Sequence, residues 1–212
     1  MTTSRKIVFW EVDAQADFML PGGKLYVPGA EKIIPNLRRL VDAANKNHVF
    51  LVSSACAHSE NDPEFKAFPP HCIRGTPGAR IVPEGLQADF HVIPNDPSFR
   101  LPDDLSRPGQ VVVEKQVLDV FSNPHASELV ERLGGDTEYV VFGVVTEYCV
   151  QFAAKGLLER GHKVTVVTDA IETLKPEDSR STLERLAALG ARLATTNQVL
   201  ASLGNGGSAK LS

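Results

Sequence analysis

The stretch YVVFGVVTEYCV, residues 139–150, decides the fold. Its first part, Tyr139–Val144, is an almost continuous apolar run, as expected for a strand that is buried on both faces. The chain then passes directly into Glu147–Arg160, where apolar side chains recur on one helical face, and Gly161 marks the end of that helix. A buried strand that leads into an amphipathic helix is the repeating unit of a parallel α/β sheet.

The same alternation of strand and helix extends in both directions from this unit. Further strands are predicted at residues 7–12, 49–54, 90–93, 111–114 and 163–168, with helices over 33–44, 125–133 and 176–189. A short strand near 192–195 and a helical turn at 198–203 follow. We therefore expect an α/β protein with a doubly wound, three-layer α/β/α architecture (Rossmann-like) around a central, mostly parallel sheet of six strands. A single domain is expected over residues 1–203, and a flexible Gly- and Ser-rich tail over 204–212.

The composition excludes several classes of partner. Twenty-two Lys and Arg stand against 26 Asp and Glu, so there is no basic field to bind nucleic acid or an anionic membrane surface. No apolar run approaches the roughly 20 residues of a membrane-spanning helix, and residues 1–6 lack the pattern of a secretory signal, so we expect a cytoplasmic protein. Three cysteines are too few for a disulfide framework, and at least one should be a free thiol.

The carboxyl ends of the strands are where a doubly wound sheet binds its ligands. Cys149 follows such a strand, in the first turn of the predicted helix and three residues after Thr146, a candidate N-cap. Free N–H groups and the helix dipole favour the thiolate there and should lower the pKa of Cys149. This position predicts a nucleophile, and the alternative is a buried cysteine that packs as a small apolar residue.

Asp13 and Lys115 directly follow two other predicted strands. Asp13 could exchange a proton with the Cys149 thiol, and Lys115 would favour the charged forms of thiol and carboxylate. Taken alone, Asp13 would be a turn or capping residue and Lys115 a surface cation. Their common position at one edge of the predicted sheet favours a shared catalytic role.

Four motifs occur in order along the chain: VDAQADF (12–18), PPHCIRGTPGA (69–79), Lys115 and GVVTEYCV (143–150). Together they resemble the isochorismatase-like cysteine hydrolases, and within that superfamily they most resemble nicotinamidases and related amidases. The resemblance runs over roughly residues 6–200. It implies the isochorismatase-like hydrolase fold and a small-molecule amide as the substrate.

The resemblance also implies roles for particular residues. Asp13, Lys115 and Cys149 correspond to a catalytic triad, and Val144–Val145 corresponds to a cis peptide bond whose neighbourhood supplies the amides of Val145 and Cys149 as the oxyanion hole. Cys149 would attack a small carboxamide, release ammonia and form a thioester, as in the conversion of nicotinamide to nicotinate.

Phe18 and Phe68 match the positions that wall the family's substrate pocket, and the alternative for both is ordinary core packing. The runner-up reaction is hydrolysis of an N-carbamoyl or ureido amide with the same triad. From other classes, the chain could be a non-catalytic or redox-active member of the fold, or a nucleotide-binding domain. No G-x-G-x-x-G follows the first strand, which disfavours the nucleotide-binding class. A homo-oligomer is expected.

A metal site beside the triad is a further implication of the resemblance. His58, Glu64 and His71 match three ligand positions of nicotinamidases, while Cys56 stands where the family has an Asp. Two imidazoles, a carboxylate and a thiolate favour one divalent ion, Zn²⁺ ahead of Mg²⁺ or Mn²⁺, with no organic cofactor. The alternative is that Cys56 marks loss of the site, with the histidines left as neutral hydrogen-bonding groups. Asp62 and Glu60 are interpreted as solvated loop charges.

Overall fold

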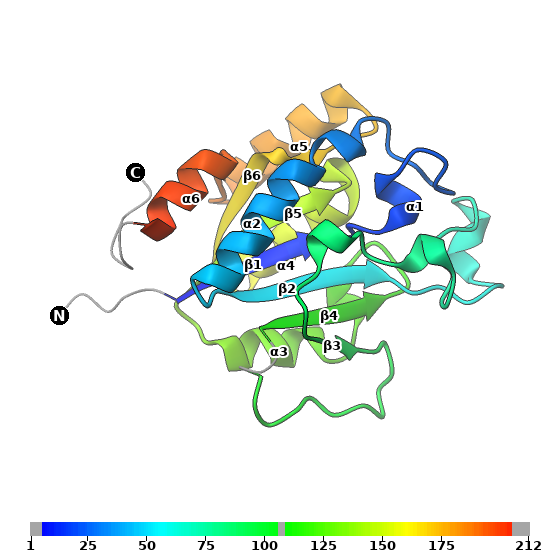
Figure 1. Ribbon diagram of the computed structural model, residues 1–212, viewed down its shortest axis with the longest axis horizontal. Helices are drawn as coiled ribbons and strands as arrows, with labels where there is room; N and C mark the ends of the chain where they lie inside the picture. The colour runs from blue at the N-terminus through cyan, green and yellow to red at the C-terminus, as the bar shows by residue number, and fades with distance from the viewer. Residues whose placement is uncertain (1–5, 106–108, 205–212) are drawn as a thin grey trace.

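A parallel sheet runs through the computed structural model, which describes residues 6–105 and 109–204 (Figure 1). The strand order is β3-β4-β2-β1-β5-β6-β7, and all neighbouring strands are parallel. The strands are β1 (Lys6–Val12), β2 (Phe50–Cys56), β3 (Phe90–Ile93), β4 (Gln110–Lys115), β5 (Thr137–Val144), β6 (Lys163–Glu172) and β7 (Arg192–Ala194). The described residues thus form seven strands and not the expected six, because the three-residue β7 pairs with β6 at the edge of the sheet.

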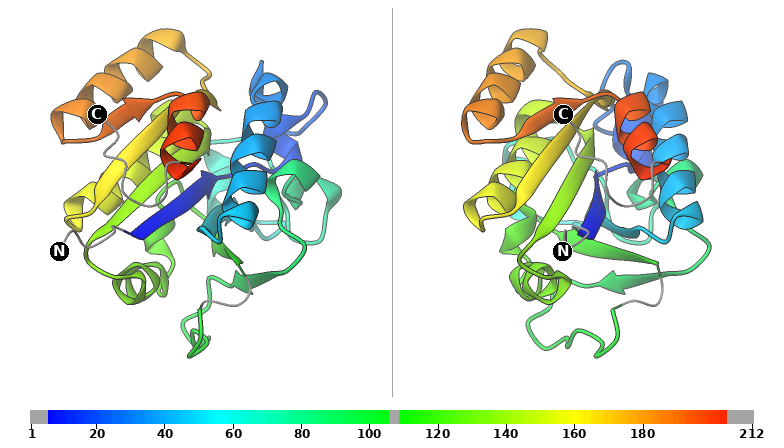
Figure 2. Two further views of the ribbon diagram at one scale, coloured as in Figure 1. Left: turned by 60° about the vertical axis from the view of Figure 1, so that its left-hand side comes forward. Right: turned by 90° about the vertical axis from the view of Figure 1, so that its left-hand side faces the viewer.

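Helices cover both faces of this sheet and give the expected three layers (Figure 2). They are α1 (Ala16–Met19), α2 (Ile34–Lys46), α3 (Ala126–Leu133), α4 (Gln151–Glu159), α5 (Pro176–Ala188) and α6 (Thr196–Gly204). On one face, Leu37 of α2 and Val199 of α6 pack with Phe9. On the other face, Leu157 of α4 packs with Trp10, the next residue along β1. Successive side chains of a strand point to opposite faces, so each central strand contributes to both cores. Residues 205–212 of the expected tail lie outside the described residues.

The central strand β1 marks the switch point of the sheet. The chain continues from β1 to β2, β3 and β4 on one side, and then returns to place β5, β6 and β7 on the other. The carboxyl ends of β1, β2, β4 and β5 therefore meet around one crevice, the place where doubly wound sheets bind ligands.

The helix predicted over residues 147–160 is interrupted at its start. Residues Thr146–Val150 form a single π-helical turn, within which Tyr148 has non-helical dihedral angles (φ −121°, ψ −107°), and α4 begins only at Gln151. The carbonyl of Val145 accepts hydrogen bonds from the backbone N–H groups of Tyr148 (3.0 Å) and Val150 (3.2 Å). The candidate N-cap is also wrong, because the hydroxyl of Thr146 donates to the carbonyl of Glu172 at 2.8 Å.

A fully buried carboxyl group, that of Glu11, lies within the sheet. Its Oε2 accepts a hydrogen bond from the Ser53 hydroxyl (2.9 Å), and Gln110 donates to the same hydroxyl (2.9 Å). The other oxygen, Oε1, has no hydrogen-bond partner in the structure. Burial is the main cause that raises the pKa of Glu11 from 4.5 to about 8, so the folded protein holds this group in its neutral form at neutral pH.

Glu11 should make stability fall as the pH rises from about 4.5 to about 8, since the unfolded carboxyl ionises in that range while the folded one stays protonated. The Glu11→Gln variant keeps a neutral side chain and should lose this decline, which amounts to at most about 5 kcal/mol in the free energy of unfolding. Urea unfolding at about pH 5 and about pH 8 measures the difference. Asp42→Asn, at an exposed carboxyl group, is the matched control. Equal pH dependence in wild type and Glu11→Gln would contradict the assignment.

Candidate active site

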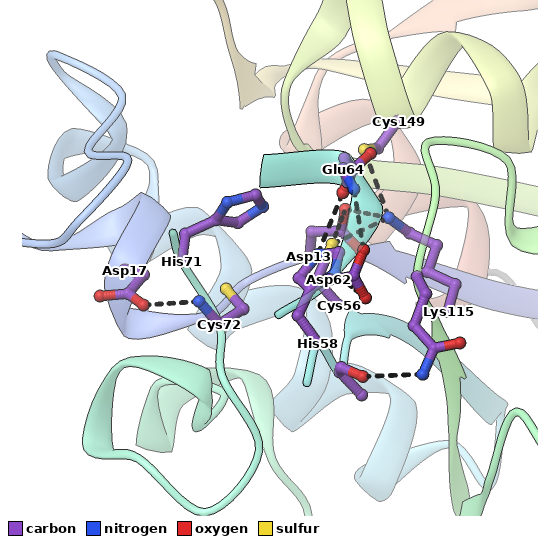
Figure 3. Close-up of polar contacts among 12 residues, drawn as sticks. Asp13, Asp17, Cys56, His58, Asp62, Glu64, His71, Cys72, Lys115 and Cys149 are labelled. Carbon is purple, nitrogen blue, oxygen red and sulfur yellow. Dashed lines mark hydrogen bonds and ion pairs between the residues drawn. The ribbon is translucent and has the colours of Figure 1, made fainter. Parts of the chain in front are cut away.

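One ammonium group lies at the centre of a cluster of side chains at the carboxyl ends of the strands. The Nζ of Lys115, the last residue of β4, lies 2.9 Å from Oδ2 of Asp13, 3.1 Å from Sγ of Cys56 and 3.4 Å from Sγ of Cys149 (Figure 3). All four residues are buried. The structure thus brings together the three residues of the predicted triad, and it adds Cys56 to them.

The strands place these groups through their register. Cys56 ends β2 directly opposite Lys115 of β4, and Asp13 follows the end of β1 in a left-handed conformation (φ 49°). The Asp13 carboxylate accepts a hydrogen bond from the hydroxyl of Ser54 at 3.1 Å. On the other side of β1, Gly143 lets β5 approach closely, because a Cβ there would lie 2.0 Å from the carbonyl oxygen of Val12.

Two further side chains of the VDAQADF motif hold the long loop against the site. The amide of Gln15 accepts a hydrogen bond from the N–H of Cys56 (2.7 Å) and donates one to the carbonyl of the same residue (2.8 Å). The carboxylate of Asp17 accepts one from the N–H of Cys72 at 2.7 Å. Neither role was predictable from the motif, because the partners of Gln15 and Asp17 lie about 41 and 55 residues away along the chain.

The pKa of the Cys149 thiol differs from the sequence prediction. Burial raises the pKa of the Cys149 thiol well above its ordinary value, the charge of Asp13 raises it further, and Lys115 lowers it only in part. The predicted lowering of this pKa is therefore wrong, because desolvation outweighs the helix dipole and the regular helix begins two residues later. Burial alone would lower the pKa of Lys115, but the charge of the Asp13 carboxylate opposes burial, and this pKa lies above its usual range. Lys115 thus stays an ammonium group, and the resting Cys149 is a thiol that needs a base.

The segment that carries Cys149 begins at a cis peptide bond between Val144 and Val145, which confirms the position that the resemblance implied. Glu147 then ties this segment to the loop after β6. Its Oε1 accepts hydrogen bonds from the N–H groups of Leu174 and Lys175 (both 3.0 Å), and its Oε2 accepts one from the hydroxyl of Thr173 (2.7 Å). Nothing in the local sequence indicated this clamp.

Aromatic rings lie around His71. Phe18 lies 5.2 Å from the ring of His71, and Phe68 lies 6.5 Å from His71 and 6.1 Å from Tyr148. Phe18 also belongs to the hydrophobic core, so it packs and faces His71 at once. Phe65, whose ring is 5.8 Å from that of His71, and Tyr148 are neighbours that the sequence analysis did not name.

Donor atoms that suit a divalent ion gather between these rings and the triad. Sγ of Cys56 and one ring nitrogen each of His58 and His71 lie within 4.8 Å of one another. Nε2 of His58 lies 3.1 Å from Oε2 of Glu64, about the separation of two ligand atoms that bind one ion at about 2.1 Å. Both ring nitrogens of His58 are buried and neither has a hydrogen bond of good geometry. These residues fit a divalent ion.

Neighbouring groups orient the two histidines. Nδ1 of His71 lies 2.8 Å from the carbonyl oxygen of Pro69, which leaves Nε2 for an ion, and burial lowers the pKa of His71 so that the ring is neutral. Nδ1 of His58 lies 3.1 Å from Oδ2 of Asp62. The interpretation of Asp62 as a solvated loop charge is wrong, because this side chain is buried against His58, whereas Glu60 is exposed as expected.

A parallel α/β sheet with a buried Asp, Lys and Cys at its switch point is the arrangement of an isochorismatase-like hydrolase. Residues 8–93 and 84–198 match the Isochorismatase domain, and the chain belongs to that family.

Three relatives place the chain among hydrolases of this family. The nicotinamidase of Escherichia coli is 27% identical over 211 residues, which cover 87% of this chain and 92% of that protein. A probable inactive nicotinamidase of Arabidopsis thaliana is 24% identical over 88% of this chain and 91% of that protein. The crystal structure of a pyrazinamidase of Pyrococcus horikoshii in complex with zinc superposes with a TM-score of 0.72 at 27% identity, over 90% of this chain and 99% of the other. The family thus includes amide-hydrolysing enzymes.

Across residues 6–105 and 109–204, the helices are all too short or too polar to cross a bilayer.

Removing the ammonium group should destabilise the fold. In Lys115→Met, the buried Asp13 carboxylate loses its counter-ion, and the expected loss is about 3–5 kcal/mol in the free energy of unfolding. Lys155→Met is the matched control, because Lys155 forms an exposed pair with Glu159 at 3.5 Å and should cost less than about 1 kcal/mol. Urea denaturation of both variants gives the comparison, and equal losses would show that the buried pair is not a stabilising contact.

Proposed function

We propose that this protein is a cysteine-dependent amidohydrolase that releases ammonia from a small planar carboxamide of the nicotinamide type. The observation that carries the proposal is the contact of one buried ammonium group, that of Lys115, with the Asp13 carboxylate and the Cys149 sulfur. This is the set of groups that acyl transfer to a thiol requires: a base, a nucleophile and a fixed charge. The likeness to nicotinamidases supports the substrate class.

The raised pKa of Cys149 makes Asp13 the base that starts the reaction, since a thiol cannot attack without losing its proton. Cys149 Sγ then attacks the carboxamide carbon, and the N–H groups of Val145 and Cys149 stabilise the oxyanion. Asp13 returns the proton to the departing ammonia, and water hydrolyses the thioester. Lys115 holds the Asp13 carboxylate in place and favours the transient thiolate throughout.

The aromatic rings and the donor cluster support a flat heteroaromatic substrate. Phe18 and Phe68 would wall the ring of the amide, with Tyr148 beside Phe68. Cys56, His58, Glu64 and His71 would hold one divalent ion, which we propose to be Zn²⁺. When bound, that ion supplies a Lewis acid for a ring nitrogen of the substrate. No organic cofactor is part of the proposal.

A second candidate substrate is an N-carbamoyl or ureido amide. The contact between Cys56 Sγ and the Lys115 ammonium favours it, because a sulfur engaged there is a poorer metal ligand than the carboxylate it replaces. An aliphatic amide of this kind has no ring nitrogen to bind an ion. A panel of both amide types, assayed with and without chelator, separates the two candidates.

Cys149→Ala should lower ammonia release from the best substrate of that panel by several orders of magnitude, because the reaction loses its nucleophile. The free energy of unfolding should change little, since one sulfur atom is removed next to a retained ion pair. Cys72→Ser, which alters a cysteine without contact to Lys115, is the matched control and should keep its turnover. Turnover that survives in Cys149→Ala would refute the proposed function.

His71→Ala should reduce bound zinc from about one ion per chain, measured by elemental analysis of the purified protein. His125→Ala changes a histidine that lies against Phe99, away from the donor cluster, and should leave the zinc content unchanged. Zinc content that is equal in both variants, or a wild type that binds none, would remove the metal assignment.

A further inference from the structure

The described site contains a second thiol, that of Cys56, which forms no bond to the substrate in the proposed hydrolysis. Sγ of Cys56 and Sγ of Cys149 lie 3.1 Å and 3.4 Å from the same nitrogen atom, Nζ of Lys115, so one ammonium group contacts both sulfur atoms (Figure 3). The cysteines come from different parts of the fold, the end of β2 and the turn after β5. Both are reduced in the structure and both are buried with a small exposed remainder, 5% for Cys56 and 7% for Cys149.

The third cysteine differs in its surroundings. Cys72 is completely buried, and its sulfur lies 4.0 Å from the carbonyl oxygen of Gly78. Its backbone is fixed by Asp17, and Lys115 makes no hydrogen bond to its sulfur. Lys115 therefore contacts the sulfur atoms of Cys56 and Cys149 and makes no such hydrogen bond to that of Cys72.

We propose that Cys56 is a resolving cysteine, which forms a disulfide bond with Cys149 after a hydroperoxide has oxidised the Cys149 sulfur. The inference rests on the proposed role of Cys149 as the nucleophile. In both reactions Asp13 would take the proton of the Cys149 thiol, since this buried thiol needs a base before its sulfur can attack a carbonyl or a peroxide. The disulfide bond switches hydrolysis off until a dithiol reduces it.

The two steps balance in atoms and electrons. Cys149 Sγ attacks one oxygen of the hydroperoxide, the O–O bond breaks, and an alcohol or water leaves with the proton of the thiol, so that Cys149 becomes a sulfenic acid. Cys56 Sγ then attacks the Cys149 sulfur, the S–O bond breaks, and the hydroxyl leaves as water with the Cys56 proton. The two thiols together lose two electrons and two protons, and the hydroperoxide accepts them.

The residues around the pair can serve both steps. Cys56 Sγ lies 3.8 Å from Oδ2 of Asp13, the same carboxylate oxygen that pairs with Lys115 at 2.9 Å. Asp13 can therefore accept a proton from either thiol, and the Lys115 ammonium faces whichever sulfur is a thiolate. Without a second thiol, a sulfenic acid proceeds to the sulfinic acid, which dithiols do not reduce. Cys56 thus protects the nucleophile from irreversible loss.

Mass spectrometry under non-reducing conditions tests the proposal on the full-length protein. Hydrogen peroxide is added to the purified wild type with and without a chelator, because an ion on Cys56 would withhold its sulfur. We expect the intact mass to fall by two hydrogen atoms, the Cys56 and Cys149 peptides to appear as one cross-linked species, and ammonia release to be lost and then restored by dithiothreitol. A Cys149 that gains oxygen atoms without a cross-link under both conditions would overturn the proposal, as would a cross-link to Cys72.

Two variants test whether Cys56 is the residue that resolves the oxidised Cys149. In Cys56→Ser, Cys149 should gain two or three oxygen atoms, and dithiothreitol should not recover its thiol. In the matched control Cys72→Ser, the cross-link between Cys56 and Cys149 should form as in the wild type. Recovery of the Cys149 thiol in Cys56→Ser would show that Cys56 does not resolve it.

The readout also separates this inference from the proposed function. The cross-link is observed by mass and needs no turnover. A cross-linked protein that hydrolyses no amide in its reduced form would leave the disulfide inference standing and remove the amidase. An active amidase whose Cys149 forms no cross-link would keep the proposed function and remove the disulfide inference.

Discussion

The buried ion pair between Lys115 and Asp13 is the contact on which the rest of the site depends. Each charge would be costly to bury alone, and the two are tolerated because their atoms lie 2.9 Å apart. This pairing requires the ends of β1 and β4 to face each other across β2, which only the observed strand order and register provide. The two sulfur atoms then complete the surroundings of the ammonium group.

The same contact bears on the proposed role of Cys149 as a nucleophile, because the pKa of its thiol is raised. Burial stabilises the neutral thiol of Cys149, so the proposed reaction begins from a protonated sulfur. Lys115 remains charged because the Asp13 carboxylate compensates for its burial. The charges are therefore in place before the reaction begins, and this arrangement lowers the cost of forming the thiolate during attack.

Cys56 stands where the resemblance to nicotinamidases would place an Asp, and its thiol adds chemistry that a carboxylate does not have. Its sulfur lies close enough to His58 and His71 to join them at an ion, and it also contacts Lys115. An ion and a disulfide bond would compete for this sulfur atom. Metal occupancy and oxidation of the site are therefore expected to oppose each other, and both act through a single residue at the end of β2.

The sequence alone determined the order of strands and helices and the positions of Asp13, Lys115 and Cys149 at the ends of strands. These features follow from apolar periodicity and from motifs within short segments, which are local properties of the chain. The resemblance named His58, Glu64 and His71 as candidate metal ligands in one loop, and in the structure His58 lies close to both of the others.

Only the tertiary structure decided what surrounds those residues. The contact of Cys56 with Lys115, the clamp of Glu147 on residues 173–175 and the burial of Asp62 against His58 depend on chain segments that meet in space. The direction of the pKa shift of Cys149 also depends on such contacts, because burial and the charge of Asp13 cause it. A sequence pattern reports which face of an element is apolar, whereas desolvation and hydrogen bonding depend on distances between segments that are far apart along the chain.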